Sequence, residues 1–184
     1  SIIVIDPPGS TDCDDGFHFD DDHLYVHIAD VDHYFQASGP YEDELKKRIT
    51  SIYAINKVYH MLPEKYASDI ISLNKNGDRK HALTVKFRLK DAAAATEPEF
   101  VCIQPSTVKV LYSLSYDEAQ QLMDFQEKVE RKLLMNIIRL GHVTGERDTH
   151  KMIEKIMIWT NQAVGKFLFN HGSNLSVYCP APPV

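Results

Sequence analysis

The chain has 184 residues, a net charge of −6 and a hydrophobic fraction of 43%, which is enough for one domain with a core. A pI near 5.8 excludes electrostatic wrapping of nucleic acid, because that mode needs clustered Lys and Arg; any such grip must be local or supplied elsewhere. The three cysteines form neither a CxxC pair nor a disulfide framework, and no apolar run approaches the ~20 residues that span a bilayer. We therefore expect an intracellular protein, cytoplasmic or nuclear, with no membrane contact.

The first part of the chain has the pattern of β-structure. Ser1 to Ile5 is apolar and β-branched, as in a buried strand, and the run is broken by Pro7 to Gly9. Alternating residues in Phe17 to Phe19 and Leu24 to Ile28 flank the turn-like Asp20 to Asp22. This arrangement predicts a strand followed by a β-hairpin.

A helix is predicted from Gly39 and Pro40 to about Tyr53, because acidic residues fill its first turn and basic residues its later turns. Strand character returns in His81 to Leu89 and in Phe100 to Leu111. The first half is therefore expected to be rich in β-structure.

Helices are predicted to dominate from Tyr116 onward. Ser115 and Glu118 form a capping box, in which each side chain satisfies an otherwise unpaired backbone donor at the start of a helix. The last helix carries apolar residues at helical spacing and ends at Gly172, a natural left-handed cap.

The segment "IDPPGSTDCDDG" places four aspartates within ten residues, punctuated by Pro and Gly that bend the backbone: Asp6, Asp12, Asp14 and Asp15. Like charges held close together repel, so a fold that gathers them usually supplies a cation. Hard oxygen ligands favour magnesium or manganese over zinc, and paired ions of this kind cleave phosphodiesters. The cluster predicts hydrolytic phosphoryl chemistry.

Three other interpretations of these acidic residues exist. A solvated acidic loop that follows a strand would have the same composition. An EF-hand loop fails, because counting from Asp12 puts Phe17 where Gly is needed and His23 where Glu is needed. The string "HIADVDH" offers an evenly spaced metal site, although a histidine within a strand is more often a satisfied core residue: His27, Asp30 and His33.

Four strings in order, "IDPPGSTDCDDGFHF", "LYVHIADVDHYF", "RITSIYAINKVYHMLPE" and "ISLNKNGDR", closely resemble the catalytic domain of the ribonuclease II (RNB) family. The Asp-Pro-Pro-Gly form and the final "PAPP" look most like the eukaryotic exosome-associated branch, and a viral relative fits equally well. With the order of elements, the resemblance implies an α+β fold: a mixed, largely antiparallel sheet in the first half, packed by helices from the second. Residues 1–184 would be the N-terminal half of the domain, without the cold-shock and S1 domains or the C-terminal catalytic segment.

The resemblance also implies roles for individual residues. Asp6 and Asp15 would be direct metal ligands, Asp14 would bind the second ion or orient the attacking water, and Asp12 would be a ligand or supporting carboxylate. Asp12, Asp14 and Asp15 are thus the catalytic candidates, with magnesium, or manganese as the alternative, as cofactor. Tyr53 matches the tyrosine that stacks on the terminal nucleotide; otherwise it is a core tyrosine at a helix end.

Tyr116 and Glu154 match residues that the family places near the ribose, where a 2′-hydroxyl can be read. The alternatives are a surface tyrosine and a solvated helix glutamate. Asn161 lies two turns beyond Glu154 on nearly the same helix face and completes the set of candidate RNA-binding residues. The sequence departs from the common family pattern at Gly16, where alanine is frequent, and also at two further positions: His60 and Cys179.

The resemblance implies a hydrolytic exoribonuclease that degrades single-stranded RNA from 3′ to 5′ and releases nucleoside 5′-monophosphates. An RNA-degrading complex such as an exosome is a candidate partner. The alternative is a catalytically inactive RNA-binding or scaffold member of the same family, against which the four retained aspartates speak. Because the family's catalytic arginine lies in the later segment, this fragment alone is expected to be inactive.

Overall fold

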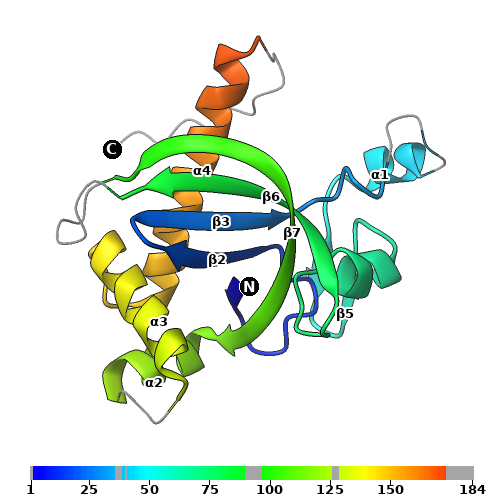
Figure 1. Cartoon of the computed structure of the whole chain (residues 1–184). Helices are drawn as coiled ribbons and strands as arrows, with labels where there is room; N and C mark the ends of the chain where they lie inside the picture. Colours follow the sequence, from blue (N-terminus) through cyan, green and yellow to red (C-terminus); the bar gives the residue numbers. More distant parts are fainter. Residues whose placement is uncertain (1, 36–38, 40, 90–96, 126–128, 173–184) are drawn as a thin grey trace, which may run out of the picture.

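The computed structural model describes residues 2–35, 39, 41–89, 97–125 and 129–172. Five strands form a closed barrel in the order β1-β2-β3-β6-β7. A small two-stranded sheet, β4-β5, lies outside it (Figure 1). The barrel strands are β1 (Ile2–Asp6), β2 (Asp15–Asp20), β3 (His23–Ala29), β6 (Arg79–Arg88) and β7 (Glu99–Ser115).

The long strand β7 closes the barrel. It has 17 residues, of which the first part pairs antiparallel with β6 and the segment from Val110 to Ser115 pairs parallel with β1. All other pairs in the barrel are antiparallel. The predicted mixed, largely antiparallel sheet is confirmed, and its closure is a feature that the sequence pattern did not predict.

Three helices follow β7 and cover one face of the strands: α2 (Tyr116–Phe125), α3 (Arg131–Thr144) and α4 (Thr149–Asn170). Phe17 and Leu24 from the barrel share one core cluster with Ile137, Met152 and Ile156 from the helices. In Figure 1, α2 and α3 lie at one end of the strands, and α1 and β5 lie at the other. No helix in the described part of the chain is long and apolar enough to cross a membrane.

Both predicted signals at helix ends are confirmed. The Ser115 hydroxyl accepts a bond from the backbone N–H of Glu118 at 3.2 Å, and the Glu118 carboxylate accepts one from the N–H of Ser115 at 2.7 Å. These bonds lower the pKa of Glu118. Gly172, just past α4, has a φ of +75°, the left-handed conformation that glycine tolerates.

The helix predicted to reach Tyr53 is wrong in its extent. Helix α1 (Glu42–Arg48) ends before Ile49, which has a φ of +64°, and Tyr53 lies in a hairpin of β4 (Ile52–Ala54) and β5 (Lys57–Tyr59). β-branched and aromatic residues in this stretch favour extended backbone over helix. The hairpin leads to η1 (Tyr66–Ile70), one turn of π-helix.

A chain of polar side chains joins four strands of the barrel; His27 and Thr84 are buried, and His18 and Ser106 are half-buried. His18 Nδ1 and His27 Nε2 are 2.8 Å apart, and His27 Nδ1 is 2.7 Å from the Thr84 hydroxyl, which in turn contacts the Ser106 hydroxyl. His27 is therefore a satisfied core residue, as one of the two sequence interpretations held. The ring of His33 stacks instead on His81, so "HIADVDH" does not form a metal site among the described residues.

Burial lowers the pKa of His27 to about 3. The folded chain therefore keeps this ring neutral in a pH range where the unfolded chain, with a histidine pKa near 6.5, binds a proton. Stability contributed by His27 is full above about pH 6.5 and is lost as the pH falls toward 3.

We predict that a His27→Gln variant loses this pH dependence, because the amide cannot take up a proton. The free energy of unfolding of wild type minus that of the variant should fall by about 1.4 kcal/mol per pH unit below pH 6. Urea unfolding of both proteins between pH 7.5 and 4.5 measures this difference. A difference that stays constant over that range contradicts the assignment.

Candidate active site

The β1–β2 connection carries the aspartate cluster. Asp6 is the last residue of β1 and Asp15 the first of β2, and because these strands are antiparallel neighbours, both carboxylates lie at the same end of the barrel. Between them the chain turns at Gly9, which has a φ of +82°, and the N–H of Ser10 donates to the Pro7 carbonyl at 3.1 Å. The turn returns Asp12 and Asp14 toward the strand ends.

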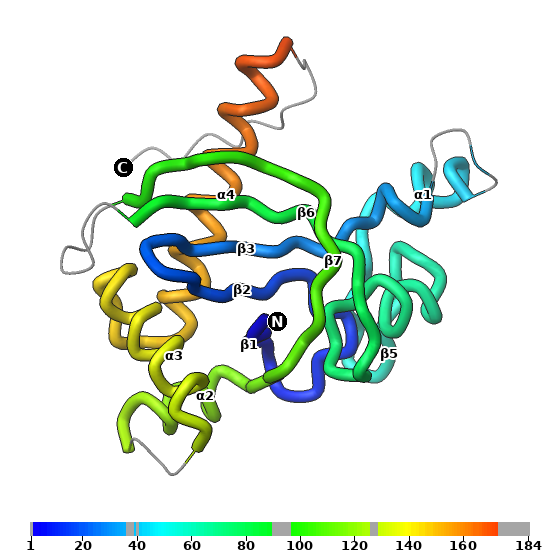
Figure 2. Tube along the Cα trace, in the orientation of Figure 1, coloured from blue at the N-terminus to red at the C-terminus, as the bar shows by residue number. Residues whose placement is uncertain are grey.

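The loop is held by the segment that follows η1. The N–H of buried Cys13 donates to the Ser72 hydroxyl at 2.9 Å, and the N–H of Leu73 donates to the Cys13 carbonyl at 2.8 Å. The Ser72 hydroxyl donates to the Thr11 carbonyl at 2.8 Å, and Ala29 of β3 donates its N–H to the Asp14 carbonyl at 2.8 Å. Figure 2 shows the blue β1–β2 loop beside the teal part of the trace that follows η1.

The carboxylates share one electrostatic field. Burial, together with the charges of Asp6 and Asp14, raises the pKa of Asp15 to about 7. Burial, followed by the charges of Asp12 and Asp6, raises the pKa of Asp14. The pKa of Asp6 is raised by burial and by the charge of Asp12, against a lowering hydrogen bond from Cys13. Asp6, Asp14 and Asp15 are therefore close enough for the charge of one to raise the pKa of another.

The donor set fits a hard divalent cation in its chemistry. All four candidate ligands are carboxylates, and the buried Oδ2 of Asp6 has no hydrogen-bond partner in the structure. No three His, Cys, Asp or Glu side chains of the described residues are grouped closely enough to hold an ion. The aspartates are therefore coupled by charge, but their side chains do not have the spacing of a coordination shell.

Tyr53 reaches the cluster from the β4–β5 hairpin. Its hydroxyl donates to Asp12 Oδ2 at 2.5 Å, and this bond is the main cause that raises the pKa of Tyr53 to about 12. The side chain is not a core tyrosine, because Tyr53 is 67% exposed. His60 Nδ1, from the same hairpin region, lies 3.9 Å from Asp12 Oδ2.

Tyr116 reaches the cluster from another direction, at the first turn of α2. The residue is half-buried, and its pKa is raised by burial and by the charges of Asp15 and Asp6. Its ring stacks on His150 of α4, with ring centroids 3.9 Å apart and an angle of 13° between the planes.

Glu154 and Asn161 are exposed on α4. No hydrogen bond or ion pair joins either side chain to the aspartates in the described part of the chain. Their assignment to RNA binding stays a prediction. Cys179 and the "SVYCPAPPV" segment lie outside the described residues.

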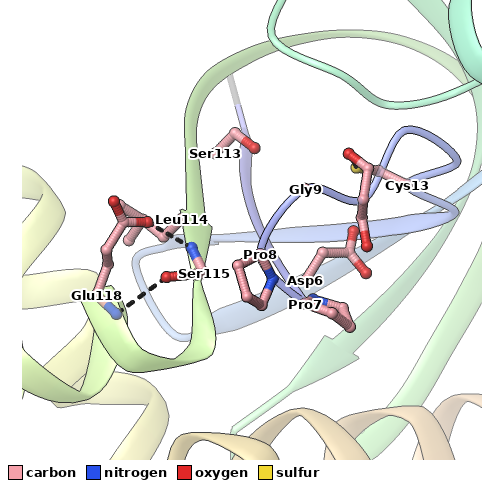
Figure 3. Close-up of a pocket in the computed structure, with 10 residues that line it drawn as sticks. Asp6, Pro7, Pro8, Gly9, Cys13, Ser113, Leu114, Ser115 and Glu118 are labelled. Atoms are coloured by element: carbon pink, nitrogen blue, oxygen red, sulfur yellow. Dashed lines mark hydrogen bonds between the residues drawn. The ribbon is translucent and has the colours of Figure 1, made fainter.

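A cavity of about 270 Å³ opens beside Asp6. Pro7 and Pro8 line one side of it, and Ser115 and Glu118 line the other (Figure 3). The volume is slightly below that of pockets that enclose small organic ligands. The cavity extends the site from the aspartate loop toward the start of α2.

Sequence reasoning missed three residues that build the site. Ser72 and Leu73 hold the aspartate loop, and His150 covers Tyr116. Ser72 lies in the string "ISLNKNGDR", which carried the resemblance but gave no role to a small hydroxyl. Gly16 allows β1 and β2 to pack closely. A Cβ at this position would lie 3.0 Å from the Ile3 carbonyl oxygen, so β1 could not approach β2 as closely.

Curated proteins with similar sequences are nucleases. The chain is 35% identical over 128 residues to "Exosome complex exonuclease RRP44 homolog A" of Arabidopsis thaliana, covering 67% of this chain and 13% of that protein. It is 28% identical to mouse "Exosome complex exonuclease RRP44", covering 99% of this chain and 23% of the relative. "Ribonuclease R 2" of Lactococcus lactis is 29% identical, with 74% and 21% covered. The chain thus spans less than a quarter of these relatives.

Solved structures share the fold. RNase R of Mycoplasma genitalium, in complex with double-stranded RNA, superimposes with a TM-score of 0.80 at 19% identity, covering 93% of this chain and 37% of that one. Yeast Ssd1, described as a pseudonuclease, superimposes with a TM-score of 0.75 at 12% identity, covering 95% of this chain and 26% of that one. At these identities the likeness concerns the fold alone.

The family model for the RNB domain matches residues 1–140, which include the whole barrel and the aspartate cluster. With this match and the identity to the Arabidopsis protein, the chain belongs to the RNB domain family of exoribonucleases.

Proposed function

We propose that the full-length protein is a hydrolytic exoribonuclease that degrades single-stranded RNA from 3′ to 5′ and releases nucleoside 5′-monophosphates. The observation that carries this proposal is the aspartate cluster: four carboxylates gathered at one end of an RNB barrel, three of them with pKa values raised by burial and by one another's charge. Without a cation, such a cluster destabilises the ionised carboxylates; a bound cation would stabilise them.

Magnesium, or manganese in its place, is the proposed cofactor, held by Asp6, Asp12, Asp14 and Asp15. When bound, it would supply charge neutralisation at the phosphodiester and a more acidic water. Asp6 and Asp15, at the two strand ends, are proposed as direct ligands. Asp14 is proposed to bind a second ion or to orient the attacking water, and Asp12 to complete the set.

The RNA grip is proposed to be local, in keeping with the net charge of −6. Tyr53 has an exposed ring, on which a base can stack without sequence preference, and a hydroxyl fixed on Asp12. Tyr116 faces the cluster from the opposite element and is proposed to contact the ribose, with Glu154 and Asn161 further along the RNA path.

An RNA-degrading complex such as an exosome is a proposed partner, since two similar proteins are named exosome complex exonucleases. A second candidate function is an inactive RNA-binding scaffold. The reason to include this candidate is that yeast Ssd1, which has the same fold, is described as a pseudonuclease. The presence of all four aspartates favours the enzyme.

We predict that Asp14→Asn in the full-length protein lowers the rate of RNA degradation at least about 100-fold, because the amide cannot replace the charge of a metal-binding carboxylate. Labelled single-stranded RNA with magnesium, analysed on denaturing gels, measures the rate. Asp20→Asn, at the exposed end of β2, is the matched control and should leave the rate unchanged. Equal rates for Asp14→Asn and wild type would reject the site, and intact RNA with wild type would favour the scaffold.

Two substitutions at Tyr53 separate its ring from its hydroxyl. Tyr53→Ala should weaken binding of a single-stranded RNA about 5- to 150-fold, because base–aromatic stacking is lost. Tyr53→Phe keeps the ring and should bind within about threefold of wild type. Fluorescence anisotropy of a labelled oligonucleotide measures both. If the two variants lose the same affinity, the contact with Asp12 matters and stacking does not.

The isolated 184-residue polypeptide is proposed to be inactive, since the arginine that the family uses against transition-state charge is expected beyond Val184. Removing a single group that stabilises transition-state charge lowers kcat by about 100- to 1,000-fold in other enzymes. The test compares equal concentrations of the polypeptide and the full-length protein on the same labelled RNA. Comparable rates would show that residues 1–184 contain the whole catalytic apparatus.

A further inference from the structure

The ring of Tyr116 is covered by a histidine from a different helix. His150, in the first turn of α4, stacks on it nearly parallel, at 3.9 Å between centroids and 13° between planes. An aromatic stack of this kind raises the population of the stacked conformation about 2- to 10-fold over unstacked conformations. The histidine therefore restricts the rotamers that the phenol can adopt.

The backbone at Tyr116 is tied to the same turn of α4. The buried Thr149 hydroxyl donates to the Tyr116 carbonyl at 3.0 Å, and the Thr149 N–H donates to the Gln120 side-chain oxygen at 3.0 Å. Gln120 also donates to the Arg147 carbonyl at 3.0 Å. The start of α4 thus fixes the main chain of Tyr116, and His150 fixes its ring.

His150 is not part of the core. Its side chain is 65% exposed, whereas the buried residues at this end of α4 are Thr149, Met152 and Ile153. The helix start is capped by Asp148, whose carboxylate accepts from the Lys151 N–H at 3.0 Å and lies 3.9 Å from His150 Nδ1. Removal of the imidazole leaves both the core and the cap in place.

We propose that His150 is a positioning residue, which by stacking holds the Tyr116 hydroxyl at the aspartate cluster so that this hydroxyl reads the 2′-hydroxyl of the bound nucleotide. The inference rests on the proposed function, because it assigns Tyr116 to the ribose. It deepens that function by placing the discrimination between RNA and DNA under the control of a residue on a separate helix.

The test uses the full-length protein and two oligonucleotides. One is all RNA, and the other is the same strand with 2′-deoxynucleotides at its last two 3′ positions. For each variant, kcat/KM is measured on both strands. The discrimination is the kcat/KM for the all-RNA strand divided by that for the strand with deoxynucleotides. Affinities for the same strands are measured in metal-free buffer, where nothing is cleaved. His150→Ala should lower the discrimination about 3- to 10-fold, the value of one neutral hydrogen bond.

Three further variants separate positioning from general damage. His150→Phe restores a flat ring and should return the discrimination to within about twofold of wild type. In a Tyr116→Phe background, His150→Ala should have no further effect, because the hydroxyl that it positions is already gone. His171→Ala is the matched control, since His171 lies next to a Phe167 ring at the far end of α4, away from the cluster.

Unchanged discrimination in His150→Ala, failure of His150→Phe to rescue it, or an additive loss in the Tyr116→Phe background would each overturn the inference. Absence of RNA degradation by wild type would instead overturn the proposed function. In that case the metal-free affinities still decide the inference: a wild-type preference for ribose that His150→Ala abolishes supports it, and no such preference refutes it.

Discussion

Mutual repulsion of carboxylates is the constraint on which the rest of the structure depends. At one end of the barrel, burial and the charges of neighbouring carboxylates raise the pKa values of Asp6, Asp14 and Asp15, so these side chains do not stabilise the loop that carries them. It is held by its backbone. Hydrogen bonds from Cys13 to Ser72, from Leu73 to Cys13 and from Ala29 to Asp14 fix the main chain without using the carboxylates. The charge is thus available for a cation.

Closure of the barrel brings the other parts of the site to this end. Because β7 leaves β6 and continues alongside β1, it delivers the start of α2 next to Asp6, and with it Tyr116 and the cavity between the two elements. The insertion between β3 and β6 supplies Tyr53 from the other side. Two aromatic side chains thereby flank one acidic centre, from segments 63 residues apart in the chain (116 − 53).

The barrel strands and the site use polar groups in opposite ways. His18, His27 and Thr84 contact one another through hydrogen bonds, and burial lowers the pKa values of both histidines, so the rings stay uncharged near neutral pH. At the cluster, by contrast, the buried Oδ2 of Asp6 has no hydrogen-bond partner, and burial and neighbouring charge raise the pKa of Asp15. Unsatisfied buried charge is expensive, and folds retain it where a ligand repays the cost.

The sequence by itself determined the local features of the fold and the position of the aspartates along the chain. Alternation gave the β2–β3 hairpin, the Ser115–Glu118 capping box gave the start of α2, and the spacing of the aspartates gave the cluster, because each depends on residues close in the chain. Tyr53 was placed in a helix and lies in a hairpin, where its hydroxyl contacts Asp12, since the extended form of Ile52–Ala54 depends on pairing with Lys57–Tyr59. Only the tertiary structure decided how β7 closes the barrel, how Ser72 holds the loop and how His150 covers Tyr116. Those contacts join residues 34 or more positions apart (150 − 116), and no local periodicity encodes them.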